Sequence, residues 1–140
     1  MRIIFLDYDG VITTIQYKYN FDERCINHLN DIIKTTGAKI VVSSSWRQGM
    51  SLKYLQQQLT DVGCIGTVIS KTRERISYWL RGLEIQDWLE DNKVDNYVVL
   101  DDSASEILPF IDNSKIVATC RYMGLTTTTK DKAIKILKGV

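Results

Sequence analysis

The sequence has few of the residues that hold small disulfide-rich or zinc-binding proteins together. Its 140 residues include three cysteines, which are widely spaced and form no Cys-x-x-Cys pair. An odd number of cysteines without paired spacing argues against both a disulfide framework and a zinc site. We therefore expect Cys25, Cys64 and Cys120 to be buried free thiols in a reducing compartment.

The chain also lacks a charge excess, a long apolar run and a proline-rich linker. Eighteen Lys and Arg residues balance 17 Asp and Glu residues, which favours neither a generic nucleic-acid binder nor an acidic tail. No signal-peptide pattern follows Met1, and no apolar run is long enough to span a bilayer. With Pro109 as the only proline, we expect residues 1–140 to form a single cytoplasmic domain without membrane contact.

What the sequence does contain is a series of short apolar runs that end in polar residues. The first of them leads directly into Asp7 and Asp9. Continuous apolar runs of this length, bounded by polar residues, are typical of fully buried strands. The expected strands lie at residues 3–6, 40–42, 67–70, 96–103 and 114–120.

Helical patterns lie between most of these runs. Apolar residues recur at helical spacing across residues 22–36, and Gly37 stands where this helix is expected to end. Residues 11–21 are rich in β-branched and aromatic residues and predict a short hairpin or flap outside the main sheet. Further helices are expected over residues 52–59, over 73–91 with a break at Gly82, around 105–110, and from the threonine run 126–129 onward.

This alternation predicts an α/β fold: a three-layer, doubly wound parallel sheet with five core strands. Continuously apolar strands are what a parallel sheet covered on both faces requires. The stretch from Trp46 to Arg81 contains a helix and a strand, which leaves no room for a separate cap domain. An uncapped site is open, and it suits a phosphate at the end of a large substrate.

Three of the expected strands end in chemically active side chains. Asp7 and Asp9 follow the first strand, Ser44 follows the second, and Asp101 and Asp102 follow the fourth. In doubly wound folds ligands bind outside the carboxyl ends of the strands. Clustered carboxylates there either share protons or bind a hard divalent cation such as Mg²⁺, which in turn indicates a phosphate substrate.

Two carboxylates set two positions apart also suit covalent phosphoryl transfer. One can attack phosphorus and form an aspartyl-phosphate, while the other acts as general acid and base. Gly10, directly after Asp9, permits the chain to turn so that both carboxylates face one substrate.

The stretches FLDYDGV, VVSSSWR and VVLDD resemble the first, second and fourth signature motifs of the haloacid dehalogenase (HAD) superfamily of phosphotransferases. Across nearly the whole chain, the sequence is most similar to the capless HAD domains of bacterial RNA-repair (Swiss-army-knife) proteins, in which SSSWR, EIQDWL and VVLDDS recur in similar arrangement. The resemblance implies a Rossmann-like HAD fold.

The resemblance also implies a role for each matching position. Asp7 would be the nucleophile and a Mg²⁺ ligand, and Asp9 the acid/base that also offers its backbone carbonyl to the metal. Ser44 would supply the phosphate-binding hydroxyl. Asp101 would be a second metal ligand, and Asp102 would coordinate directly or through water.

Other positions admit alternatives. For the cation of the third signature, Arg81 fits the spacing best and Lys71 is the second candidate.

The phosphate-binding hydroxyl could also belong to Ser43 or Ser45. Trp46 and Arg47, which follow directly, could contact substrate or pack internally.

We therefore expect a Mg²⁺-dependent phosphohydrolase that acts through an aspartyl-phosphate on a phosphorylated macromolecule, such as an RNA or DNA end. The alternatives are a receiver-like phospho-acceptor signalling module and a non-catalytic binding domain. Asp9 distinguishes the phosphohydrolase from the signalling module, because a long-lived phospho-aspartate is better preserved without an adjacent base.

Overall fold

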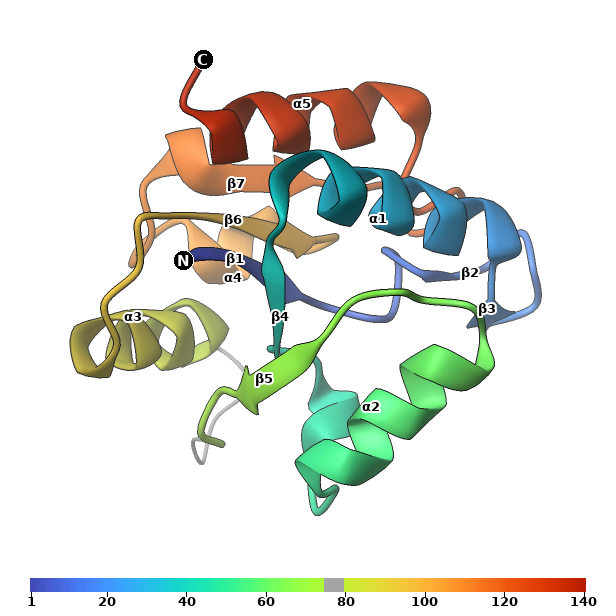
Figure 1. Ribbon diagram of the computed structural model, residues 1–140, viewed down its shortest axis with the longest axis horizontal. Helices are drawn as coiled ribbons and strands as arrows, with labels where there is room; N and C mark the ends of the chain where they lie inside the picture. The colour runs from blue at the N-terminus through green and yellow to red at the C-terminus, as the bar shows by residue number, and fades with distance from the viewer. Residues whose placement is uncertain (75–79) are drawn as a thin grey trace.

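The computed structural model describes residues 1–74 and 80–140. Its centre is a five-stranded sheet in the order β5-β4-β1-β6-β7, with every neighbouring pair parallel (Figure 1). The first strand therefore lies in the middle, and strand order reverses beside it, which is the doubly wound arrangement predicted. The strands are β1 (Arg2–Leu6), β4 (Lys39–Val42), β5 (Val68–Lys71), β6 (Asn96–Asp101) and β7 (Ile116–Ala118).

Helices cover both faces of this sheet and make the three layers. Side chains alternate across a strand, so that Ile4 and Leu6 belong to one apolar core and Ile3 and Phe5 to another. The first core includes buried residues of α1, α2 and α5, and the second includes those of α3 and α4. The helices are α1 (Glu23–Thr36), α2 (Leu52–Asp61), α3 (Arg81–Asp91), α4 (Ala104–Ile107) and α5 (Thr127–Lys138).

The predicted flap is present as a short antiparallel hairpin, β2 (Thr13–Thr14) and β3 (Asn20–Phe21). Two sets of hydrogen bonds fix residues 13–21, which we call the flap. The Thr14 hydroxyl donates to Asp22, the N-cap of α1, at 3.0 Å. On the other side, the Ile15 amide donates to the Arg121 carbonyl at 3.3 Å. The flap is thus held between the start of α1 and the segment that follows β7.

The helix predicted over residues 73–91 differs in the structure. Residues 75–79 lie outside the described residues, and α3 begins at Arg81. The predicted break at Gly82 is wrong, because Gly82 lies inside α3. A β-carbon there would come within 2.7 Å of the Ile107 carbonyl oxygen, so the glycine permits close packing of α3 on α4.

The predicted start of the last helix is confirmed, and the prediction for the cysteines is confirmed in part. A capping box between Thr126 and Thr129 starts α5, as the threonine run predicted. All three cysteines are free, and Cys25 and Cys64 are buried, but Cys120 is exposed. Cys120 lies just past β7, in a turn where its carbonyl accepts from the Gly124 amide, and this turn lies outside the core.

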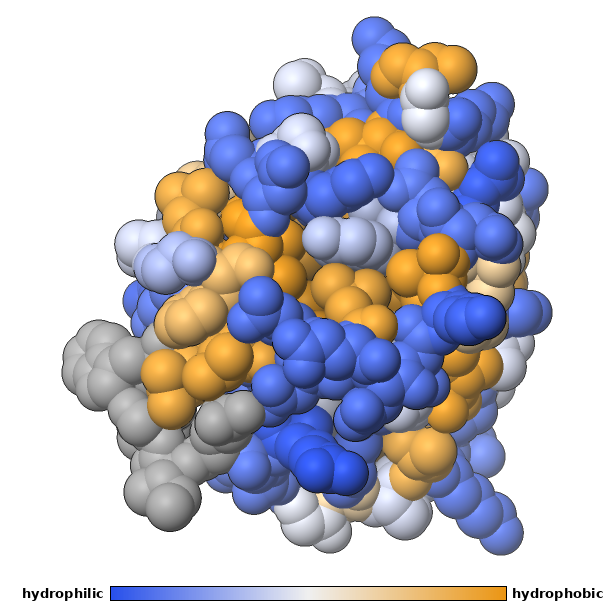
Figure 2. Space-filling view, turned by 90° about the vertical axis from the view of Figure 1, so that its left-hand side faces the viewer, coloured by the Kyte–Doolittle hydropathy of each residue, from blue (hydrophilic) through white to orange (hydrophobic). Residues whose placement is uncertain are grey.

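The described residues contain no separate cap domain: besides the five-stranded sheet and its helices, they form the flap and short 3₁₀ turns. None of the helices in these residues has the length and apolar composition that a bilayer-spanning segment requires. Figure 2 shows one face of the molecule, on which hydrophilic side chains interrupt the apolar areas.

Candidate active site

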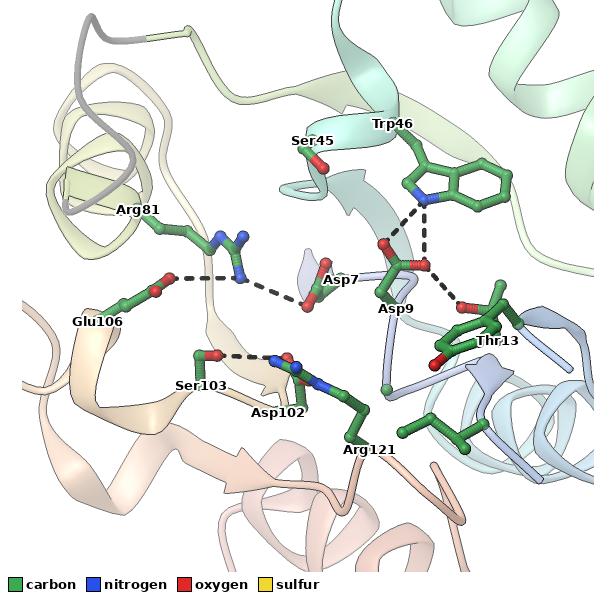
Figure 3. Close-up of a pocket in the computed structure, with 13 residues that line it drawn as sticks. Asp7, Asp9, Thr13, Ser45, Trp46, Arg81, Asp102, Ser103, Glu106 and Arg121 are labelled. Atoms are coloured by element: carbon green, nitrogen blue, oxygen red, sulfur yellow. Dashed lines mark hydrogen bonds and ion pairs between the residues drawn. The ribbon is translucent and has the colours of Figure 1, made fainter. Parts of the chain in front are cut away.

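A pocket of about 460 Å³ opens at the carboxyl ends of the central strands (Figure 3). The residues that line it follow the carboxyl ends of β1, β4, β6 and β7, or belong to the flap and to the start of α3. The lining residues are Asp7, Asp9 and Gly10 after β1, Thr13, Ile15 and Tyr19 from the flap, Ser45 and Trp46 after β4, Arg81 at the start of α3, Asp102, Ser103 and Glu106 after β6, and Arg121 after β7.

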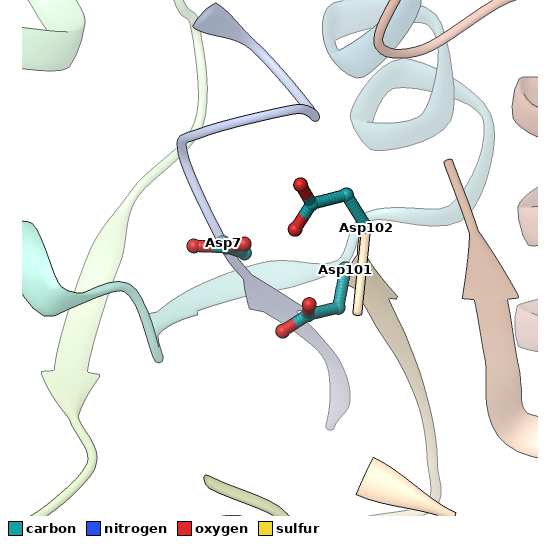
Figure 4. A group of neighbouring side chains, drawn as sticks. All are labelled: Asp7, Asp101 and Asp102. Carbon is teal, nitrogen blue, oxygen red and sulfur yellow. The ribbon is translucent and has the colours of Figure 1, made fainter. Parts of the chain in front are cut away.

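Three carboxylates meet at this edge (Figure 4). Asp7, Asp101 and Asp102 each place a carboxylate oxygen within 4.8 Å of the others. The strand register explains this meeting: Leu6 is paired with Leu100, so the residues that follow them emerge side by side. Asp7 is 3 % exposed and Asp101 is fully buried. The convergence predicted for the first and fourth motifs is therefore present in the fold.

Burial and crowding make this cluster unfavourable for three free negative charges. Burial, with the nearby charges of Asp101 and Asp102, raises the pKa of Asp7 to about 8, although Arg81 opposes the rise. Burial likewise raises the pKa of Asp101. Carboxylates crowded in this way are stabilised in their charged form by a cation among them. The set of hard oxygen donors fits Mg²⁺, which commonly binds a few carboxylates together with water and phosphate.

Arg81 brings a positive charge to the same cluster. One of its terminal nitrogens donates to Asp101 at 2.9 Å and to Asp7 at 3.4 Å, and lies 3.8 Å from Glu106. Burial alone would lower the pKa of Arg81, but the charges of Asp101 and Asp7 raise it, so the guanidinium stays protonated.

Of the two candidate cations, only Arg81 lines the pocket. The Lys71 ammonium instead donates to the backbone carbonyls of Met50, at 2.6 Å, and Arg47, at 3.3 Å. These bonds hold the end of β5 to the segment after β4. Of these two side chains, Arg81 is therefore the one that faces the pocket.

Asp9 is exposed, and its carboxylate is held from two sides (Figure 3). The Thr13 hydroxyl donates to one oxygen at 2.8 Å, and the Trp46 indole N–H lies 3.2 Å from both oxygens. The Trp46 ring packs against Tyr8 and Phe21, each at a centroid separation of 5.4 Å. Trp46 is thus anchored in the core while it orients Asp9 in the pocket.

Gly10 is needed for two reasons. Its φ is +78°, a left-handed conformation that other residues rarely adopt. A β-carbon at this position would also lie 2.5 Å from a carboxylate oxygen of Asp102. Glycine therefore makes the turn after Asp9 and lets the third carboxylate approach the backbone.

The three serines after β4 occupy different environments. Ser43 and Ser44 are fully buried, and the Ser44 hydroxyl accepts from the Trp46 amide at 3.2 Å, capping a short 3₁₀ turn (Ser45–Arg47). Within the described residues, the Ser43 hydroxyl has no hydrogen-bond partner. Ser45 is exposed and lines the pocket. The hydroxyl that faces the pocket therefore belongs to Ser45, one position after the residue the motif favoured.

Arg47 does not reach the pocket. Its side chain is 4 % exposed and forms an ion pair with Glu84 of α3 at 2.8 Å. The same guanidinium donates to the Ser44 carbonyl at 2.8 Å and the Thr72 carbonyl at 2.9 Å. Of the two alternatives for Arg47, substrate contact and internal packing, the structure shows internal packing, which connects the turn after β4 to α3.

Several pocket residues were not identified from the sequence. Arg121 follows the fifth strand, and the same end-of-strand reasoning that found Asp101 could have identified it. Its Nε donates to Asp102 at 2.9 Å. Thr13 and Tyr19 come from the flap and Glu106 from α4. No local pattern marks these three, because their positions depend on how the flap and a four-residue helix fold back.

A doubly wound parallel sheet with an Asp-x-Asp turn after its central strand and a carboxylate pair after the neighbouring strand defines the HAD class. Residues 3–129 match the family described as the HAD domain in Swiss Army Knife RNA repair proteins. The chain belongs to this family. No curated protein and no solved structure matches the chain. Membership of a HAD family suggests a phosphohydrolase.

Proposed function

We propose that this chain is a Mg²⁺-dependent phosphomonoesterase that forms an aspartyl-phosphate on Asp7. One observation carries the proposal: three carboxylates converge within 4.8 Å of one another, and two of them, Asp7 and Asp102, line a pocket that is also lined by Arg81 and by a further, oriented carboxylate, Asp9. A site for phosphoryl transfer needs a nucleophile, an acid/base and positive charge, and these groups can supply all three.

Asp7, Asp101 and Asp102 would hold the metal, together with the backbone carbonyl of Asp9. Bound there, Mg²⁺ would neutralise the crowded carboxylates and the charge of the phosphoryl group. Arg81 neutralises part of the carboxylate charge without the metal, since it donates to both Asp7 and Asp101.

The chemistry divides between the two carboxylates after β1. A carboxylate oxygen of Asp7 attacks phosphorus, and the bond from phosphorus to the leaving oxygen breaks. Asp9 gives its proton to that leaving oxygen. Asp9 then takes a proton from water, whose oxygen attacks phosphorus and releases Asp7 and inorganic phosphate. Thr13 and Trp46 hold Asp9 in one orientation for both transfers.

Arg81 and Ser45 are the groups that would position the phosphoryl oxygens. Arg81 is a permanent cation at the pocket edge, and such fixed charge stabilises developing negative charge without reorganisation. Ser45 offers a hydroxyl from the wall that follows β4, near Trp46 (Figure 3).

We propose a phosphorylated nucleic-acid end as the substrate. The family to which the chain belongs is named for RNA-repair proteins. The pocket is also open: in residues 1–74 and 80–140 no cap domain covers it, so that the phosphate of a polymer can enter.

Phosphate release from an aryl phosphate tests the chemistry directly. We expect turnover by the native protein with Mg²⁺, loss of turnover with a chelator, and background release by Asp7→Asn, which removes the nucleophile but keeps the side-chain shape. Stoichiometric labelling of Asp7 without turnover would instead identify a phospho-acceptor module. Turnover by Asp7→Asn at the native rate would rule out the covalent route.

A further inference from the structure

The rim of the pocket carries exposed apolar side chains beside the carboxylate cluster. Ile15 and Tyr19 of the flap both line the pocket, and they are 36 % and 69 % exposed. A large aromatic ring left this exposed at the mouth of a charged pocket is available to a ligand. The proposed chemistry uses neither residue.

The backbone beneath this ring is strained. Lys18 and Tyr19 have φ values of +55° and +64°, and they are the non-glycine residues with positive φ among those described. Hydrogen bonds hold the turn in this form: the Tyr19 amide donates to the Thr14 carbonyl at 2.7 Å, and the Lys18 amide to the Ile15 carbonyl at 3.0 Å. Strain of this kind concentrates at functional sites and ligand clamps.

Positive charge lines the same pocket as the Tyr19 ring. Arg121 lines the same pocket and is 66 % exposed along its side chain, with its Nε bonded to Asp102. The flap is hydrogen-bonded to the backbone of this residue through Ile15, so the aromatic and cationic groups belong to one connected wall. An exposed aromatic ring with a neighbouring cation is the arrangement that binds single-stranded nucleic acid, since bases stack on the ring and phosphates pair with the cation.

We propose that Tyr19, supported by Ile15, stacks on the nucleobase adjacent to the phosphate that enters the pocket, while Arg121 contacts the next backbone phosphate. The ligand is the end of a single-stranded polynucleotide, and Tyr19 determines specificity for it. This inference rests on the proposed function, since it places the phosphomonoester at Asp7.

Short RNA oligonucleotides that carry a terminal phosphate test the role of the base. Two versions are compared, one with an ordinary terminal nucleotide and one whose terminal nucleotide lacks its base, each with the phosphate at the 3′ or the 5′ end. We expect the native protein to show a KM about tenfold lower for the base-containing end at whichever terminus is hydrolysed, with similar kcat.

Variants at position 19 separate the ring from the backbone. Tyr19→Gly removes the ring and suits the positive φ, so the flap can keep its shape, and Tyr19→Phe keeps the ring. We expect the tenfold preference to disappear in Tyr19→Gly and to persist in Tyr19→Phe. The matched control is Tyr17→Ala, because Tyr17 lies on the same flap and is 57 % exposed but does not line the pocket. This control should keep the full preference.

The outcomes separate this inference from the proposed function. If the native protein hydrolyses the base-containing and base-lacking ends with the same KM, stacking by Tyr19 is overturned. The same holds if Tyr19→Gly keeps the native preference. Either result leaves the proposed phosphatase chemistry in place. Preferential hydrolysis of a phosphotyrosyl peptide over every oligonucleotide overturns the polynucleotide as ligand. No phosphate release from any substrate with Mg²⁺ overturns both proposals.

Discussion

The floor and the rim of the pocket are built by different physical means. The floor, consisting of Asp7, Asp101 and Asp102, lies at the carboxyl ends of β1 and β6, two paired strands whose side chains are buried toward these ends. The rim, consisting of Ile15, Tyr19 and Arg121, belongs to the flap and the turn after β7, and its side chains are exposed. The floor is positioned by the regular hydrogen bonds of the sheet, and the rim by a few turn hydrogen bonds and two left-handed residues.

The two proposals assign different roles to these two regions. Groups that perform chemistry must stay within a fraction of an ångström of one geometry, which central strands provide. Groups that select a ligand can tolerate more movement, and loops on a rigid scaffold commonly carry them. Substitutions in the floor or its supports should therefore affect every substrate, whereas those in the rim should change only which substrate is preferred.

We expect the largest effect on folding from the buried ion pair between Arg47 and Glu84. Arg47 and Glu84 are 4 % and 8 % exposed along their side chains, and they connect the turn that carries Ser45 with the helix that begins at Arg81. Glu84→Ala leaves a permanent positive charge buried beside carbonyl groups. We expect it to lower the free energy of unfolding by about 3–5 kcal/mol in a denaturant titration.

A partly exposed pair provides the control for this prediction. Lys130 and Asp31 lie 3.8 Å apart, with Asp31 49 % exposed along its side chain, and Asp31→Ala should cost less than about 1 kcal/mol. Replacing both buried partners, as Arg47→Met with Glu84→Leu, should recover much of the lost stability. Equal and small losses in Glu84→Ala and Asp31→Ala would show that the ion pair does not support the floor.

A smaller effect is expected where the floor approaches its own backbone. Gly10→Ala and Gly37→Ala both place a β-carbon at a positive φ, +78° and +71°, but only the first new β-carbon meets another side chain, that of Asp102 at 2.5 Å. We expect Gly10→Ala to be less stable than Gly37→Ala by about 1–3 kcal/mol, the usual cost of overpacking. Because Asp102 must move, Gly10→Ala should also bind Mg²⁺ more weakly in calorimetric titration.

The two glycine variants test the metal site as well as stability. Gly37 ends α1, and an added β-carbon there would have no neighbouring atom of the described residues within 4 Å, so Gly37→Ala should bind Mg²⁺ as the native protein does. If both variants bind the ion equally well, the close approach of Asp102 to Gly10 has no part in holding it.

The contrast between floor and rim also explains how much could be predicted from the sequence. Apolar runs marked the five strands, and the rule that ligands gather at the carboxyl ends of parallel strands placed Asp7 beside Asp101. That inference needed only strand order and direction. The hairpin of residues 11–21 was predicted as an element, but the exposure of Tyr19 at the pocket follows from two left-handed residues, and neither is the glycine that usually signals them.

Side-chain partners were the hardest to predict. The choice among Ser43, Ser44 and Ser45 depends on a 3₁₀ turn that buries the first two and exposes the third. Arg47 looks like a substrate contact in sequence, because its partner Glu84 lies 37 positions away on α3. Gly82 suggests a helix break in the sequence, but in the structure it lies against the carbonyl of Ile107, where a β-carbon would not fit. For Arg47 and Gly82, a contact distant in sequence decides the role.

The smallest effect concerns the anchor of the flap. Asp22 caps α1 and accepts from the Thr14 hydroxyl, so it joins the rim to the core. Burial alone would raise the pKa of Asp22, but hydrogen bonds from Arg24 and Thr14 lower it below the ordinary 3.8. A depressed folded-state pKa stabilises the protein above the unfolded pKa, and this stabilisation is lost as the pH falls through the folded value. Asp22→Asn keeps a capping oxygen and removes the charge.

We therefore expect Asp22→Asn to be about 1 kcal/mol less stable than the native protein at pH 7, since hydrogen bonds to a charged group exceed those to a neutral one. The difference should shrink as the pH falls below 3.8, as denaturant titrations of both proteins at several pH values would show. Asp112→Asn is the matched control, because Asp112 caps a 3₁₀ turn (Asn113–Lys115) from an exposed position and should show a smaller difference. A difference in stability that stays constant across the pH range would mean that the charge of Asp22 does not contribute to holding the flap. The turn hydrogen bonds would then be what positions the rim.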